Sequence, residues 1–235
     1  MINRLAILAV GAAAAALAPQ AAAAPARKAA APAAVDWSKR VAATPEGGFV
    51  MGNPAAKVKV VEYGSLTCPH CAAFSNSAKA ALASQVRTGK VSFEFRNYVL
   101  NGIDIAATLV ARCGGTARFF PLSEKLYATQ KAWTGRINSL PQAQQAQLKA
   151  MADGPRLVRL AQLGGMTQLA AQSGLPAART NACLANPASL KRVIAMAEAA
   201  EAIGVEGTPT FFINGRNVGT HDWESLEPLI RQAGG

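Results

Sequence analysis

The segment Cys68-Pro69-His70-Cys71 holds the residues whose types and spacing could do chemistry. Two cysteines three positions apart at a helix start can close a small disulfide. When they are reduced, the first thiol lies at the helix N-terminus, where free N–H groups and the helix dipole favour a thiolate. Pro69 suits the first helical turn, and His70 adds a donor or, when protonated, a cation. The pattern predicts a first cysteine with a strongly lowered pKa and an oxidising disulfide.

Three other interpretations of the pair stay open. A Cys-x-x-Cys pair can be half of a zinc site, but tetrahedral zinc needs two more ligands, and the remaining cysteines and His221 are isolated in the sequence. Two thiolates could hold copper(I) in a non-enzymatic binding module. The pair could also form an inert structural disulfide. The spacing at a helix start favours redox chemistry over these.

A strand, a helix and a second strand would position the pair. Residues 58–63 alternate as a strand, with the acid Glu62 at the end of its apolar face. Residues 68–86 carry an apolar stripe with helical spacing. Residues 91–96 alternate again. This order predicts a right-handed βαβ unit in which the cysteines follow the first strand.

The rest of the chain predicts a helical block and then a second mixed unit. Between about residues 105 and 203 no strand pattern is convincing. Two short strands then flank the turn Asn214-Gly215, a strong hairpin signal. A final helix follows, for which Ser225 is the expected N-cap, so that Pro228 would lie in the first turn. The predicted fold class is α/β, a thioredoxin-like fold (βαβ plus ββα) with an all-helical inserted domain.

Domain boundaries follow from these patterns and from the start of the chain. Residues 1–26 have a short basic start, an apolar run and small residues, as in a secretory signal peptide that is cleaved after export. Residues 27–45 are rich in Ala and Pro and indicate a linker. We expect a thioredoxin-like domain over 46–104 and 189–235, with the helical domain inserted over 105–188. The expected location is the periplasm, an oxidising compartment.

Composition excludes several classes of protein. The chain has 24 Lys and Arg against 13 Asp and Glu, a net charge of +11. The basic residues form no run longer than two, whereas a nucleic-acid binder would cluster them on one face with interleaved aromatics. We therefore expect no nucleic-acid partner. A hydrophobic fraction of 51% with 16% charged residues argues against disorder of the whole chain.

Two motifs in this order resemble the DsbA family of thiol:disulfide oxidoreductases. The Cys-Pro-His-Cys motif follows a strand, and the segment Gly207-Thr-Pro-Thr-Phe-Phe-Ile-Asn-Gly215 comes roughly 140 residues later, after the helical block. The resemblance covers about residues 46–235. It implies that Cys68 is the exposed nucleophile and Cys71 its buried partner.

The same resemblance implies roles for three further residues. Pro209 matches a cis-proline that packs beside the disulfide, and Thr208 matches the residue that faces the cysteines and presents its backbone to substrate. Glu62 matches an acid beneath the active site. A solvent-facing acid at the strand end is the alternative for Glu62.

Cys113 and Cys183 both fall in the helical block. They could be free buried thiols, but in an exported protein a bridge is favoured, and some members of the resembled family carry a second, structural disulfide there. Closing a loop of 70 residues would stabilise the fold by about 4 kcal/mol in the chain-entropy model.

The leading hypothesis is an exported oxidase that donates its Cys68–Cys71 disulfide to unfolded or partly folded secreted proteins. We expect no metal or organic cofactor, because the cysteine pair is itself the redox centre. The resemblance implies re-oxidation by a DsbB-like, quinone-linked membrane oxidase. The alternatives are a periplasmic reductase or isomerase and the copper-binding module.

Overall fold

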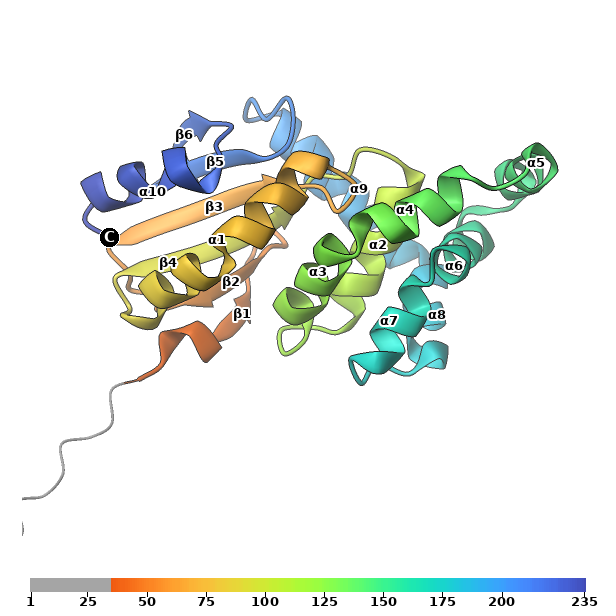
Figure 1. Cartoon of the computed structure of the whole chain (residues 1–235), viewed down its shortest axis with the longest axis horizontal. Helices are drawn as coiled ribbons and strands as arrows, with labels where there is room; N and C mark the ends of the chain where they lie inside the picture. Colours follow the sequence, from red (N-terminus) through yellow and green to blue (C-terminus); the bar gives the residue numbers. More distant parts are fainter. Residues whose placement is uncertain (1–34) are drawn as a thin grey trace, which may run out of the picture. The chain divides into compact units, whose positions relative to one another are not determined.

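The computed structural model describes residues 35–235, and its sheet is built around two parallel strands. The predicted signal peptide and the first residues of the predicted linker lie outside the described residues. Six strands form one sheet in the order β1-β2-β4-β3-β5-β6 (Figure 1). Their bounds are β1 Val41–Ala43, β2 Phe49–Gly52, β3 Val58–Gly64, β4 Val91–Asn97, β5 Thr210–Ile213 and β6 Arg216–Gly219.

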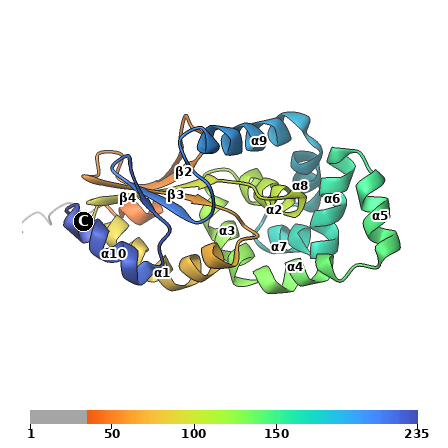
Figure 2. The ribbon, with the colours of Figure 1, turned by 90° about the horizontal axis from the view of Figure 1, so that it is seen from above.

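The predicted βαβ unit is confirmed. Strand β3 pairs in parallel with β4, from Val58 opposite Val91 to Gly64 opposite Asn97. Helix α1 (Pro69–Arg87) connects them. Figure 2 shows α1 and α10 (Trp223–Gln232) on one side of the sheet and α9 (Pro187–Glu201) on the other. Because helices cover both faces, β4 is buried along most of its length instead of alternating cleanly.

Eight helices follow β4 without a strand between them, as the sequence predicted. They are α2 Gly102–Cys113, α3 Phe119–Ala128, α4 Gln130–Asn138, α5 Gln142–Ala150, α6 Asp153–Gly164, α7 Met166–Gln172, α8 Ala177–Ala185 and α9. Their core contains the fully buried Trp133, whose indole Nε1–H donates to the Leu126 carbonyl at 2.8 Å. The side chain of Asn186 caps α9 by accepting from the Ala188 N–H at 2.9 Å.

The predicted bridge between Cys113 and Cys183 is present and joins α2 to α8. The two residues are 70 positions apart in the chain. The bridge therefore ties the first helix after β4 to a helix near the end of the helical block. Within residues 35–235, no helix combines the length and apolarity that crossing a membrane would require.

The predicted hairpin is confirmed, whereas the predicted start of the last helix is wrong. Asn214 and Gly215 both have positive φ, at 51° and 81°, as the tight turn between β5 and β6 demands. Helix α10 begins at Trp223 because the Asp222 carboxylate accepts the Ser225 N–H at 3.0 Å. Asp222, not Ser225, is therefore the N-cap. Pro228 consequently lies inside the helix, where it supplies no N–H to the preceding turn.

The segment before β3 contains structure that the sequence did not predict. Residues 37–43, which composition assigned to the linker, form a short 3-10 helix η1 (Trp37–Lys39) and the edge strand β1. Strand β2 pairs antiparallel with β4. The loop between β1 and β2 is held by the Thr44 hydroxyl, which donates to the Glu94 carboxylate at 2.6 Å. Arg96 Nε donates to the same carboxylate at 2.8 Å.

Candidate active site

The cysteine pair lies where β3 passes into α1, as predicted. Cys68 is the N-cap of α1 and Pro69 is its first residue. Cys71 lies one turn further along and is completely buried, whereas Cys68 is 6% exposed. Both cysteines are free thiols in the structure. The nucleophile expected to meet a protein substrate is thus the one of the two that reaches the surface.

Thr208 and Pro209 are brought beside Cys68 from 140 positions along the chain. The Cys68 thiol donates to the Thr208 carbonyl at 3.2 Å. The peptide bond between Thr208 and Pro209 is cis, as the resemblance implied. The residue before the proline therefore presents its backbone to the reactive sulfur. The roles of both residues in exchange remain predictions.

The surroundings of Cys68 lower the pKa of its thiol to about 5. The largest cause is the hydrogen bond from the Cys71 thiol; the Thr208 side chain and the backbone N–H groups of Cys71 and His70 add to it, and burial opposes them. These donors act because the first turn of a helix leaves its N–H groups free. Burial and the hydrogen bond to Cys68 raise the pKa of the Cys71 thiol far above its ordinary range. One sulfur is thus favoured as an anion and the other as a neutral thiol.

Glu62 lies beneath the pair and is 2% exposed, so the structure places it in the interior and not at a solvent-facing strand end. Burial, together with the negative charge of Cys68, raises the pKa of Glu62 to about 8. Its charge in turn raises the pKa of Cys71. The acid and the buried thiol therefore influence each other, and a proton held by either disfavours ionisation of the other less than a negative charge would.

His70 lies on the exposed side of the first turn and borders a groove on the far side of Pro209. Trp223 and His221 line the same groove. The His221 ring is held by the Val218 carbonyl at 2.7 Å and the Ser225 hydroxyl at 3.1 Å. The contribution of His70 to Cys68 that the structure supports comes from its backbone N–H.

Three residues of the helical block hold the loop that leads into Cys68, and the sequence analysis missed all three. The Gln130 side-chain amide donates to the carbonyls of Leu66 and Cys68, both at 2.9 Å. The Tyr127 hydroxyl donates to the Ser65 carbonyl at 3.1 Å. These buried bonds fix the backbone immediately before the nucleophile. No local pattern marks the two residues, because their partners lie more than 60 positions away.

Asp104 is the third of these residues. Its fully buried carboxylate accepts the N–H groups of Leu66 and Leu100, each at 2.9 Å. Burial raises the pKa of Asp104 to about 6, against the effect of those hydrogen bonds. A sequence signal does exist here, since Asn101 is a helix N-cap and Asp104 follows in the first turn, where an acid is favoured.

An open groove borders Cys68 on the side of the helical block. Leu100 and Ile103 give it an apolar floor, Lys131 and Thr134 give polar edges, and Gly207 and Thr208 form the opposite wall. Leu100 is 50% exposed, an unusual state for a leucine beside a reactive group. A groove with an apolar floor and exposed backbone at its wall can receive an extended peptide.

Comparisons with known proteins agree with this geometry. The family model described as thioredoxin matches residues 44–232. A crystal structure described as a protein-disulfide isomerase from Novosphingobium aromaticivorans has 33% sequence identity and a TM-score of 0.74, covering 80% of this chain and 98% of that one. Wolbachia pipientis α-DsbA1, with 21% identity, a TM-score of 0.62 and 78% and 89% coverage, shares the fold.

Similar curated sequences are longer than this chain. A Rickettsia felis protein named as a protein-disulfide oxidoreductase is 26% identical over 193 residues, which is 80% of this chain and 60% of the relative. The chain thus spans about three fifths of that relative's length. With the family model matched over most of its length, and with its helical block inserted after the βαβ unit, the chain belongs to the thioredoxin family and is DsbA-like within it.

Proposed function

We propose that the protein is a thiol:disulfide oxidoreductase that donates a Cys68–Cys71 disulfide to protein thiols. The observation that carries the proposal is the contrast between the two sulfurs. Cys68 has its pKa lowered to about 5 by hydrogen bonds, while burial raises that of Cys71. An anion stabilised at Cys68 favours the reduced pair, and this makes the disulfide an oxidant.

Exchange would run in two displacements. A substrate thiolate attacks Cys68 Sγ of the oxidised pair, a new S–S bond forms, and the Cys68–Cys71 bond breaks with its electron pair going to Cys71. A second substrate thiolate then attacks the substrate sulfur of the mixed disulfide and expels Cys68 as a thiolate. The substrate loses two electrons, the enzyme gains them, and no metal or organic cofactor enters the balance.

Glu62 would supply the proton that the leaving Cys71 sulfur needs. The carboxyl is buried and its pKa lies near 8, so it holds a proton at neutral pH. Cys71 is completely buried, so its anion would be expensive to leave unprotonated. In the second displacement the leaving group is Cys68, which the helix start already stabilises.

The proposal extends to the setting in which the protein works. An export signal at residues 1–26, cleavage of that segment and a periplasmic location would place the pair among newly secreted proteins with free thiols. A DsbB-like, quinone-linked membrane oxidase would restore the disulfide. Support comes from the structural disulfide between Cys113 and Cys183, a bond favoured in oxidising compartments.

The test is refolding of reduced ribonuclease by the oxidised protein. We expect Cys68→Ser to abolish the gain of ribonuclease activity, because no mixed disulfide can form. The matched control is the double variant Cys113→Ser with Cys183→Ser, which removes the other disulfide and should still oxidise ribonuclease at a temperature where it stays folded. Full activity of Cys68→Ser would contradict the proposal.

A reductase or isomerase is the second candidate, favoured by the name of the Novosphingobium relative. The reduction potential against glutathione separates the two. An oxidase should lie near the DsbA value of about −120 mV, and a reductase near the thioredoxin value of about −270 mV. Rearrangement of scrambled ribonuclease, with catalytic amounts of reduced protein, would identify an isomerase.

A further inference from the structure

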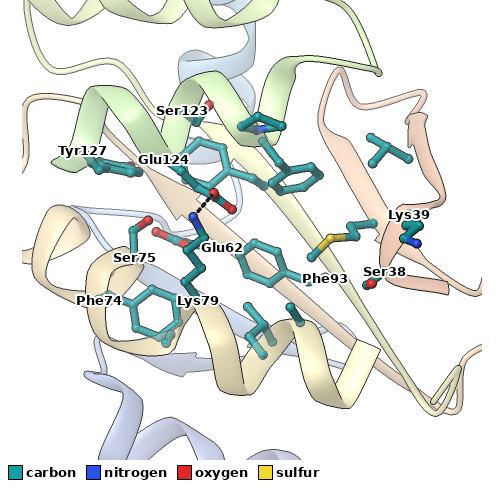
Figure 3. Close-up of a pocket in the computed structure, with 18 of the residues that line it drawn as sticks. Ser38, Lys39, Glu62, Phe74, Ser75, Lys79, Phe93, Ser123, Glu124 and Tyr127 are labelled. Carbon is teal, nitrogen blue, oxygen red and sulfur yellow. Dashed lines mark ion pairs between the residues drawn. The ribbon is translucent and has the colours of Figure 1, made fainter. Parts of the chain in front are cut away.

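A second hollow lies away from the peptide groove, between α1 and α3 over one face of the sheet. It has a volume of about 410 Å³, within the range of small-molecule sites. Its walls are largely aromatic, as Figure 3 shows: Phe74 comes from α1, Phe93 and Phe95 from β4, and Phe120 and Tyr127 from α3. Neither Cys68 nor Cys71 lines it.

Two buried polar atoms in this cavity have no hydrogen-bond partner within residues 35–235. One is Glu62 Oε1, on a side chain that is 2% exposed, and the other is Ser123 Oγ, on a residue that is 5% exposed. Both residues line the cavity. A buried polar atom left unpaired costs about 1–3 kcal/mol. A molecule that hydrogen-bonds to either atom would recover part of that cost.

The charges around the cavity select a neutral occupant. Lys79 and Glu124 form an ion pair of 2.6 Å between α1 and α3, and their side chains are 60% and 33% exposed. The dashed line in Figure 3 marks this pair. An anion would meet the carboxyl groups of Glu62 and Glu124. A cation would have to pass Lys79 and lose its hydration among aromatic rings.

We propose that the cavity between α1 and α3 binds a small neutral aromatic alcohol, with its ring between Phe74, Phe93 and Phe120 and its hydroxyl on Glu62 or Ser123. Aromatic walls favour a flat ring through offset and edge contacts. A hydroxyl both donates and accepts, so it can serve a carboxyl oxygen as well as a serine hydroxyl. The proposal does not depend on exchange activity.

Phenol is the probe, and its binding to the full chain can be followed by calorimetry and by NMR titration. For a ligand of this size we expect a Kd of about 0.1–1 mM. Toluene has the same shape without the hydroxyl and should bind about tenfold more weakly, the equivalent of one net hydrogen bond. Benzoate and benzylamine, the anionic and cationic counterparts, should bind more weakly than toluene.

Two variants locate the site. Ala83 lines the cavity on α1, so Ala83→Leu should weaken phenol binding at least tenfold, whereas Ala80→Leu, on the exposed side of the same helix, should leave it unchanged. Ser123→Ala should weaken phenol binding by about threefold or more without changing toluene binding. Its control is Ser139→Ala, at an exposed position after α4.

Several results would overturn the proposal. They are equal affinity for phenol and toluene, tighter binding of benzylamine than of phenol, unchanged phenol binding in Ala83→Leu, or ordered water alone on Glu62 and Ser123 in crystals grown with phenol. The ribonuclease assay separates this failure from a failure of the proposed function. Cys68→Ser, inactive in that assay, should bind phenol as tightly as the wild type.

Discussion

The reaction of Cys68 with iodoacetamide should depend on pH in a way that no ordinary cysteine shares. The donors at the start of α1 lower the pKa of this thiol to about 5, against an ordinary value of about 8.5. At pH 5 about half of Cys68 is thiolate, whereas an ordinary cysteine is about 0.03% thiolate. The ratio of reactive species is then about 1600.

The intrinsic reactivity of the thiolate works in the opposite direction. Nucleophilicity falls by about 0.45 log units for each unit of lowered pKa, which amounts to about 40-fold over this difference. Reduced protein should therefore react about 40-fold faster than a cysteine peptide at pH 5 and about 30-fold slower at pH 9. The two rates should cross near pH 7. Cys71, completely buried, should not interfere.

The assay is the second-order rate constant for alkylation of reduced protein between pH 4 and pH 10, relative to a blocked cysteine peptide measured alongside. Mass spectrometry of the peptide that contains Cys68 confirms the site. Cys71→Ala is the internal check: it removes the largest cause of the low pKa, so its midpoint should move upward. A wild-type midpoint near 8.5, or rates that do not cross, would refute the reasoning.

Three further perturbations test the structure around the site. Replacing Cys113 and Cys183 by serine should lower the free energy of unfolding by about 4 kcal/mol, measured by denaturant titration, since the bridge closes 70 residues; a loss under 1 kcal/mol would count against a stabilising role. Gln130→Ala should cost about 2–4 kcal/mol in the same measurement, because two buried carbonyls lose their donor, while the exposed Gln142→Ala should cost almost nothing. In the folded protein Glu62 keeps a proton up to about pH 8 that the unfolded chain releases above about pH 4.5. Glu62→Gln should therefore gain stability relative to the wild type as pH rises through that window, by on the order of 1.4 kcal/mol per pKa unit, and a gain that does not vary with pH would show that Glu62 is already ionised.

The parts of the fold that the sequence predicted correctly are those governed by local patterns. The βαβ unit, the Asn214-Gly215 hairpin and the Asn186 cap each depend on residues a few positions apart. Strands β1 and β2 could not be predicted in this way, because they are short and depend on pairing with β4, some 40 positions later. The start of α10 was misplaced because two candidate caps, Asp222 and Ser225, lie three residues apart.

The candidate site divides along the same line. Cys68 and Cys71 are adjacent enough to form a motif, and Glu62 shares the strand that leads to them. The resemblance supplied Thr208 and Pro209, which the fold brings together with Cys68 across 140 positions. Gln130 and Tyr127 belong to no motif, since a glutamine or tyrosine in a helix is ordinarily a surface or core residue. Their importance exists only in the folded chain.

These long-range contacts give the inserted helices a function in the site itself. If the block served only to cover the cysteines, its bonds to the loop before Cys68 could be replaced by water without consequence. Gln130, Tyr127 and Asp104 instead hold the polar backbone groups of residues 65–68, and all three side chains are buried. The N–H groups that stabilise a Cys68 thiolate point correctly only while that loop is fixed. Gln130→Ala should therefore raise the alkylation midpoint of Cys68 as well as lower stability, and the exposed Gln142→Ala should do neither. A variant that loses stability with an unchanged midpoint would show that the helix start alone sets the reactivity of Cys68.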